Sequence, residues 1–180
     1  MKILAISGSL RATSLNTVVL RAAGRLAPTG VTIELFDGIG SLPFFNSDLE
    51  GEHLPEAVAG FRAAIGAADG LLISSPEYAR GVSGVMKNAL DWLVGSLEFP
   101  NKPVALINTS PRATHALAAL TLTLETMSAQ LVKEACVTLP LLGTASDEAA
   151  IVANAALAAP LREAVARFAA AIRSLSSTAS

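Results

Sequence analysis

The chain has little cysteine and little histidine, and each shortage excludes a class of chemistry. Cys136 is the only cysteine among 180 residues, which excludes an internal disulfide and a cysteine-rich metal site. The two histidines, His53 and His115, are too far apart in sequence for a zinc motif. We therefore expect no metal site, and any chemistry has to use an organic cofactor or ordinary acid–base groups.

Charge is also scarce and has no dominant sign. Charged residues make up 16% of the chain, and the formal net charge is −2. A nucleic-acid-binding domain usually carries a basic excess, which this chain lacks. No uncharged run reaches the roughly 18 residues that a membrane-spanning helix needs, and the apolar start at residues 3–6 is too short for a signal peptide. We expect a cytoplasmic protein that binds neither nucleic acid nor membrane.

Apolar residues, by contrast, make up 52% of the chain, and short apolar runs alternate with longer helical patterns. Short runs without polar alternation are typical of parallel strands covered on both faces. The expected strands are Lys2–Ser7, Val31–Phe36, Gly70–Ser75, Pro103–Asn108 and Leu131–Leu139. The expected helices are Leu15–Ala27, Leu54–Ala68, Gly84–Gly95, Thr114–Gln130 and Asp147–Arg173.

This strict alternation predicts one α/β domain over residues 1–175, with an open, doubly wound parallel sheet. The low-complexity end, residues 176–180, is expected to be a frayed tail. Cys136, in the last expected strand, reads as a buried small apolar residue. Ligands of such sheets bind beyond the carboxyl ends of the strands, where the strand order reverses. That rule selects three loops, at residues 8–16, 75–84 and 109–113.

The first loop has the composition of a phosphate site. It lies between a strand and a helix, and a helix N-terminus offers free backbone N–H groups and a partial positive charge. Gly8 permits a sharp turn and a close approach of the backbone to a ligand, and Arg11 supplies one full positive charge. Short polar side chains add further donors: Ser9, Thr13, Ser14 and Asn16. From composition alone, an ordinary helix N-cap with Arg11 in solvent remains an equal alternative.

Two other phosphate motifs are excluded here. The segment lacks the Gly-Lys-Ser/Thr ending of a Walker loop and the three spaced glycines of a dinucleotide fingerprint. Asp37, after the second expected strand, is therefore read as a turn residue and not as a ribose-binding acid.

The second loop offers a surface for a planar ring. Tyr78 is the only tyrosine of the chain, and Gly81 and Gly84 would allow a tight path close to a flat ligand. Backbone amides near Glu77 and Tyr78 could bind the polar edge of such a ring. The alternative is a plain turn with an exposed tyrosine. In the following helix we expect Trp92 to pack in the core.

Both loops resemble the NADPH-dependent FMN reductase family. Gly8-Ser9-Leu10-Arg11-x-x-Ser14-x-Asn16 is similar to the family's phosphate-binding signature. Pro76-Glu77-Tyr78, the spaced glycines and Lys87-Asn88-Ala89-x-Asp91-Trp92 are similar to its second motif. The resemblance implies a flavodoxin-like, five-stranded sheet of order 2-1-3-4-5. It also implies FMN-binding residues, with the phosphate at Ser9, Leu10, Arg11, Ser14, Leu15 and Asn16, and the flavin near Pro76, Glu77, Tyr78, Gly81 and Ser110.

The third loop departs from the glycine-rich turn of many family members. It reads Asn108-Thr109-Ser110-Pro111-Arg112-Ala113. Ser110 and Thr109 could still donate hydrogen bonds to the flavin. Arg112 and His115 would stand near the open mouth, where they either attract the phosphates of the nicotinamide cofactor or simply lie on the surface. The departure leaves the choice between NADPH and NADH open.

The resemblance implies an enzyme that passes electrons from NADPH or NADH through FMN to free flavin, a quinone or another small acceptor. No side chain is then an essential acid or base. The family also implies a homodimer or homotetramer, which fits the mean hydropathy of +0.52.

Two other functions remain as alternatives. A flavodoxin-type electron carrier is disfavoured because such carriers are usually strongly acidic. A hydrolase is disfavoured because Gly81-Val82-Ser83-Gly84 misses the Gly-x-Ser-x-Gly pattern by one position.

Overall fold

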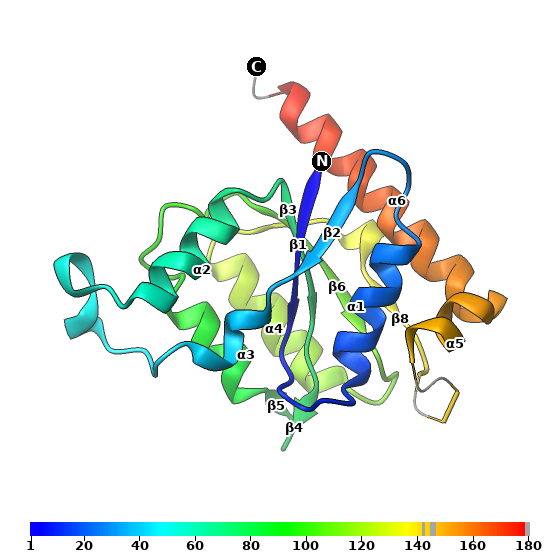
Figure 1. The fold of residues 1–180 in the computed structure, drawn as a ribbon, viewed down its shortest axis with the longest axis horizontal. Helices are drawn as coiled ribbons and strands as arrows, with labels where there is room; N and C mark the ends of the chain where they lie inside the picture. The colour runs from blue at the N-terminus through cyan, green and yellow to red at the C-terminus, as the bar shows by residue number, and fades with distance from the viewer. Residues whose placement is uncertain (142, 145–146, 179–180) are drawn as a thin grey trace.

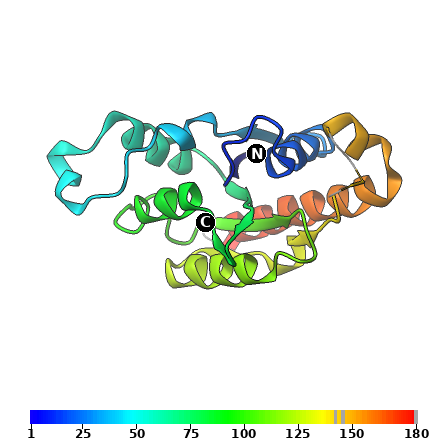
Figure 2. The same cartoon turned by 90° about the horizontal axis from the view of Figure 1, so that it is seen from below.

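The computed structural model describes residues 1–141, 143–144 and 147–178 and has a parallel sheet between two layers of helices (Figures 1 and 2). The strands are β1 (Lys2–Ser7), β2 (Thr32–Leu35), β3 (Gly70–Ser74), β6 (Pro103–Asn108), β7 (Gln130–Leu131) and β8 (Val137–Thr138). They are ordered β2–β1–β3–β6–β7, and β8 pairs with β6 beyond the end of β7. With β7 and β8 as two halves of a fifth strand, the predicted flavodoxin-like order 2-1-3-4-5 is confirmed.

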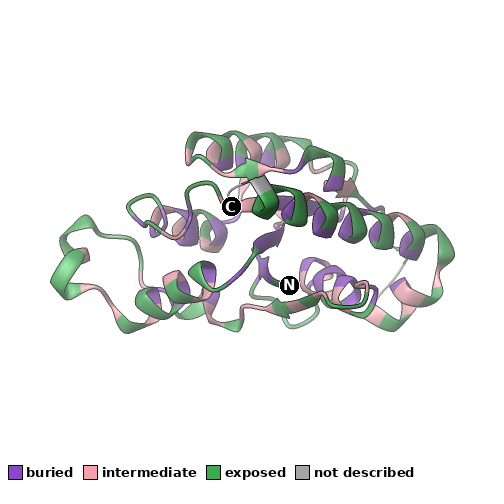
Figure 3. Ribbon diagram, turned by 90° about the horizontal axis from the view of Figure 1, so that it is seen from above, coloured by how far each residue is buried: buried purple, intermediate pink, exposed green. Residues whose placement is uncertain are grey.

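Two hydrophobic clusters fill the spaces between the sheet and its helices. One face is covered by α1 (Leu15–Arg25), α5 (Glu148–Ala153) and α6 (Ala155–Thr178). The other face is covered by α2 (Glu56–Gly66), α3 (Gly84–Asp91) and α4 (Thr114–Thr126). Figure 3 shows buried residues along the helix sides that face the sheet and exposed residues on the outer sides.

The strands alternate between these clusters residue by residue. Ile3 and Ala5 of β1 join the α1 side, and Leu4 and Ile6 join the α2 side. Both side-chain directions of the inner strands β1, β3 and β6 are therefore buried, which explains why these strands appear in the sequence as continuous apolar runs.

The prediction of one continuous strand over Leu131–Leu139 is wrong. A 3-10 turn, η4 (Lys133–Ala135), separates β7 from β8 because the exposed Lys133 and Glu134 interrupt the apolar run. Cys136 follows this turn and is half-buried, so it is not the buried strand residue expected. Its sulfur accepts a hydrogen bond from the backbone N–H of Leu106 at 3.3 Å, which satisfies a donor of β6 at the interruption.

The prediction of one final helix over Asp147–Arg173 is also wrong. Asn154 ends α5 in an extended conformation, and its side-chain oxygen accepts a hydrogen bond from the N–H of Ala156 at 3.0 Å. Asn154 thus caps the start of α6, a role that asparagine strongly prefers. Helix α6 then continues to Thr178, through residues expected in the frayed tail, and residues 179–180 lie outside the described part.

A long segment of 3-10 turns between β2 and α2 was not predicted. It contains η1 (Asp37–Ser41), η2 (Ser47–Leu49) and η3 (Gly51–His53), so Asp37 begins a 3-10 turn. Trp92 is fully buried, as expected, and its indole N–H donates to the carbonyl of Pro43 at 2.7 Å. The Asn88 side-chain amide donates to the same carbonyl at 2.9 Å. Two side chains of one motif therefore attach this segment to the body of the domain.

Candidate functional site

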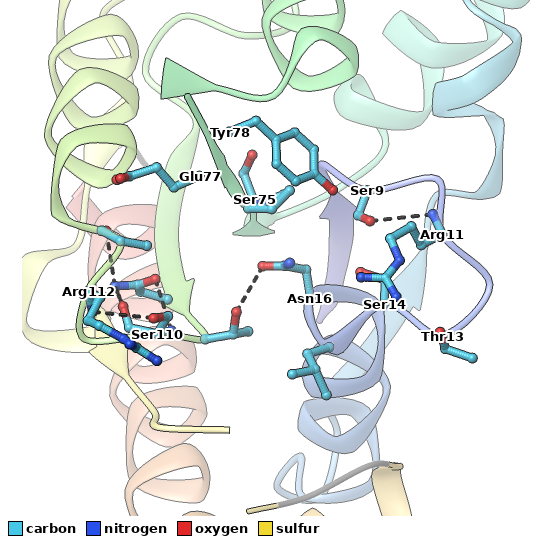
Figure 4. Close-up of a pocket in the computed structure, with 15 residues that line it drawn as sticks. Ser9, Arg11, Thr13, Ser14, Asn16, Ser75, Glu77, Tyr78, Ser110 and Arg112 are labelled. Carbon is cyan, nitrogen blue, oxygen red and sulfur yellow. Dashed lines mark hydrogen bonds between the residues drawn. The ribbon is translucent and has the colours of Figure 1, made fainter. Parts of the chain in front are cut away.

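A cavity of about 410 Å³ lies beyond the carboxyl ends of β1, β3 and β6, where the three selected loops meet (Figure 4). Nine of the eleven predicted site residues line it: Ser9, Arg11, Ser14, Leu15, Asn16, Pro76, Glu77, Tyr78 and Ser110. Leu10 and Gly81 are not among its lining residues. The exposed Leu10 side chain lies against Gly40. Leu10 stays a predicted contact of the FMN phosphate, and Gly81 a predicted contact of the flavin ring.

The N-terminus of α1 opens into this cavity with its capping side chain unused. Ser14 is the N-cap residue, yet its side chain makes no capping hydrogen bond. Its Oγ is buried and has no hydrogen-bond partner among the described residues. A buried hydroxyl without a partner costs about 1–3 kcal/mol. An anion at this helix end would bind the hydroxyl together with the free N–H groups of the first turn.

Arg11 adds a positive charge to the same wall. It is exposed, lines the cavity and forms no ion pair within the described part of the chain. The hydroxyl of Ser9 accepts a hydrogen bond from the Arg11 backbone N–H at 3.4 Å, which shapes the turn. One guanidinium, short hydroxyls and an open helix end form a donor set that fits a phosphate monoester.

Gly8 packs the first loop against the second, and its expected close approach to a ligand stays a prediction. Its φ is not positive, but a Cβ at this position would lie 2.4 Å from Ser75 Oγ and 2.9 Å from Ser83 Oγ. The Ser83 hydroxyl donates to the carbonyl of Gly8 at 2.6 Å. The first loop is thus pressed directly against the second, and only glycine leaves room for this contact.

Asn16, in the first turn of α1, joins the first loop to the end of β3 and to the third loop. Its Oδ1 accepts hydrogen bonds from Ser74 Oγ at 2.9 Å and from Thr109 Oγ1 at 3.4 Å. The side-chain oxygen is therefore committed within the protein. The predicted contribution of Asn16 to phosphate binding remains open only for its amide N–H₂ and its backbone N–H.

A short hairpin, which the sequence did not predict, carries the second loop. Strands β4 (Glu77–Tyr78) and β5 (Gly81–Val82) pair antiparallel across a two-residue turn. Ala79 and Arg80 form this turn with φ of 50° and 60°, the left-handed conformations that such a tight turn requires. Gly81 and Gly84 have no positive φ, and the expected tight path of these glycines close to a flat ligand stays a prediction. Tyr78 is half-exposed and faces the cavity (Figure 4).

The third loop is closed by Asn108, whose importance the sequence did not reveal. The Asn108 side-chain amide donates to the carbonyl of Ser110 at 2.7 Å, and its oxygen accepts from the Ser110 N–H at 3.3 Å. The Ser110 hydroxyl accepts from the backbone N–H of Arg112 at 3.3 Å. These bonds place Ser110 and Arg112 on the cavity wall. His115 is exposed on α4 and is not among the lining residues.

The arrangement does not support hydrolysis. Ser83, the nucleophile of that alternative, is buried, and its hydroxyl is bound to Gly8 and lies 3.2 Å from Ser75 Oγ. Both histidines are exposed and neither lines the cavity. Within the described ranges no cluster of three metal-ligating side chains occurs. No helix in those ranges is long and apolar enough to cross a bilayer.

The family model described as NADPH-dependent FMN reductase matches residues 1–141. The chain belongs to this family. Over 112 residues it is 45% identical to the NAD(P)H-dependent FMN reductase PA1204 of Pseudomonas aeruginosa, covering 61% of this chain and 60% of that protein. Over 113 residues it is 42% identical to a 2-hydroxy-1,4-benzoquinone reductase of a Burkholderia species, covering 61% of each chain. The match thus spans about three fifths of these curated relatives.

A structural relative extends the likeness to almost the whole chain. FerB, a flavoenzyme NAD(P)H:(acceptor) oxidoreductase from Paracoccus denitrificans, superposes with a TM-score of 0.82 at 31% sequence identity. The superposition covers 96% of this chain and 97% of FerB. This member of the FMN reductase family therefore shares both sequence and fold with FerB, including the elements that build the cavity.

Proposed function

We propose that this family member is an NAD(P)H-dependent oxidoreductase that binds FMN in the cavity and reduces small acceptors of the quinone type. The observation that carries the proposal is the open N-terminus of α1, with the unpartnered Ser14 hydroxyl beside the unpaired Arg11 among the described residues. Relatives named FMN reductase and quinone reductase support the same activity. A cytoplasmic location accords with NAD(P)H as the electron donor.

The side chains divide the work of binding and orientation. The start of α1 and Arg11 would hold the phosphate, while Tyr78 and Ser110 would lie along the rest of the ligand. When bound, FMN supplies hydride and electron transfer, which no side chain of this chain can supply. The protein then has to hold the flavin ring at the opening of the cavity, where a second ligand can reach it.

The proposal is tested with protein stripped of ligand and titrated with FMN, followed by anaerobic addition of NADPH or NADH. We expect saturable FMN binding and bleaching of the visible flavin absorption without any added reductase. A protein that binds FMN but is bleached by neither nucleotide would be an electron carrier of the flavodoxin type instead. A protein that binds no FMN would refute the proposal.

We further infer that the chain forms a homodimer through the outer surface of α3 and α4. A hollow of about 520 Å³ lies between these helices and includes the exposed side chains of Val94 and Leu122. Lys87 and Asp91 line the same hollow and form an ion pair with each other. An apolar patch whose neighbouring charges are paired within the chain can meet its own copy across a twofold axis.

A further inference from the structure

Two guanidinium groups line the cavity, from opposite walls. Arg11 comes from the loop after β1, and Arg112 comes from the loop after β6 (Figure 4). Both side chains are exposed, and neither forms an ion pair in the part of the chain that the structure describes. A mononucleotide brings one phosphate. With that phosphate at Arg11 and α1, the second cation is left for another anion.

The two helices that begin at the cavity differ in their N-termini. Helix α1 leaves its capping hydroxyl, Ser14 Oγ, without a partner. Helix α4 is already capped, because Glu77 Oε2 accepts the N–H of Ala116 at 2.8 Å. The N-terminus of α1, with its unpartnered hydroxyl, is therefore the site for a permanently bound anion. In the third loop, the buried donors of Asn108 and Thr109 already have partners, so Arg112 is the group left for a ligand.

The third loop nevertheless holds Arg112 in a defined place. Its backbone N–H is bound to the Ser110 hydroxyl, and Ser110 is in turn held by both ends of the Asn108 side-chain amide. The other charged residues that line the cavity are Arg11 and Glu77, whose carboxylate is directed to α4. An exposed cation on a fixed loop suits a ligand that binds and leaves in each turnover.

Resting on the proposed function, we propose that Arg112 binds a phosphate of the nicotinamide dinucleotide and so determines the affinity of the enzyme for its electron donor. Arg112 has no part in holding the phosphate of FMN. The 2′-phosphate of NADPH and the pyrophosphate shared by NADPH and NADH present the same chemistry to a guanidinium. Parallel measurements with the two nucleotides distinguish them.

The test compares Arg112→Gln with Arg173→Gln in FMN-loaded protein. Arg173 is an exposed residue of α6, and the preceding Ile172 lies against Gly70 at the start of β3, so its variant controls for loss of one positive charge away from the cavity. Binding of NADP⁺ and NAD⁺ is measured by calorimetry, and binding of FMN by quenching of its fluorescence. For Arg112→Gln we expect the Kd of NADP⁺ to rise about tenfold and its salt dependence to weaken. The Kd of FMN should stay within about twofold of the wild-type value.

The measurements with NADP⁺, NAD⁺ and FMN distinguish the possible roles of Arg112. A loss confined to NADP⁺ supports the proposal with the 2′-phosphate as ligand, and an equal loss for NAD⁺ supports it with the pyrophosphate. Unchanged nucleotide binding overturns it, as does a rise in the Kd of FMN that matches the rise for NADP⁺. If wild-type FMN-loaded protein is reduced by neither nucleotide, the proposed function itself fails, independently of the Arg112 variant.

Discussion

The carboxylate of Glu77 accepts a hydrogen bond from the backbone N–H of Ala116, with Oε2 and N 2.8 Å apart. Glu77 begins the hairpin that carries Tyr78, and Ala116 lies in the first turn of α4. One bond thus ties a wall of the cavity to a helix 39 residues later in the chain. It also gives α4 a helix cap that its own N-cap residue, Ala113, cannot provide.

Replacing this carboxylate should weaken both the fold and the site. We expect Glu77→Ala to lower the free energy of unfolding by about 1 kcal/mol, the usual contribution of a helix cap, and to weaken FMN binding because the hairpin loses its support. Urea unfolding of FMN-free protein and an FMN titration measure the two effects. Glu77→Gln keeps an accepting oxygen at the same reach and should lose less. Equal values for Glu77→Ala and the wild type would show that the bond has no role.

Gly8 should tolerate no side chain, because the first two loops touch at this point. A methyl group there would lie 2.4 Å from Ser75 Oγ and 2.8 Å from Ser75 Cβ. We expect Gly8→Ala to lower the free energy of unfolding by about 1–3 kcal/mol and to weaken FMN binding. Gly84→Ala is the matched control: nothing lies within 4 Å of its added methyl group, and alanine favours the helix that begins there. Equal stability of the two variants would contradict the packing described here.

The sequence predicts which residues form the site better than it predicts what each of them does. The three loops and nine lining residues follow from strand order and motif resemblance, because parallel strands bring their carboxyl ends to one edge. The roles of Gly8 and Asn16 do not follow, since each depends on contacts with residues more than 55 positions away in the chain. The hairpin at Ala79 and Arg80 also escaped prediction, because neither residue type normally adopts a positive φ.

The same limit applies to the fold. Continuous apolar runs predicted the three inner strands, β1, β3 and β6, well, since burial on both faces leaves a clear pattern. The fifth strand failed at η4, where a local turn and a hydrogen bond from Leu106 to the Cys136 sulfur replace the regular ladder. This turn depends on a hydrogen bond with the neighbouring strand, so the sequence of the segment alone does not predict it.

Cys136 should react slowly with thiol reagents. Burial raises the pKa of its thiol, so at about pH 8 less thiolate is present in the folded protein than in the unfolded chain. We expect labelling by iodoacetamide to be at least about tenfold slower in native buffer than in urea. The thiol's contribution to stability is complete below its unfolded pKa and is lost as the pH rises through the raised folded value. As the pH is raised into the alkaline range, the free energy of unfolding should therefore fall more for the wild-type protein than for Cys136→Ala. Equally fast labelling in both states would refute this.

The dimer surface is tested by placing a charge in the hollow between α3 and α4. We expect Val94→Lys to weaken dimerisation by about tenfold or more, because the lysine would be desolvated against an apolar surface. Sedimentation velocity over a dilution series gives the dissociation constant. Leu175→Lys, on α6 at the other face of the sheet, should sediment like the wild type. A wild-type protein that is monomeric throughout, or a Val94→Lys protein with an unchanged constant, would exclude this interface.

The most direct measurement compares the affinity of ligand-free protein for FMN and for riboflavin, which differ only in the phosphate. If the start of α1 holds that phosphate, FMN should bind at least about a hundredfold more tightly than riboflavin. The double variant Arg11→Gln, Ser14→Ala should bring the two affinities close together while leaving riboflavin binding unchanged. Equal affinities of the wild-type protein for the two flavins would contradict a phosphate site at this helix.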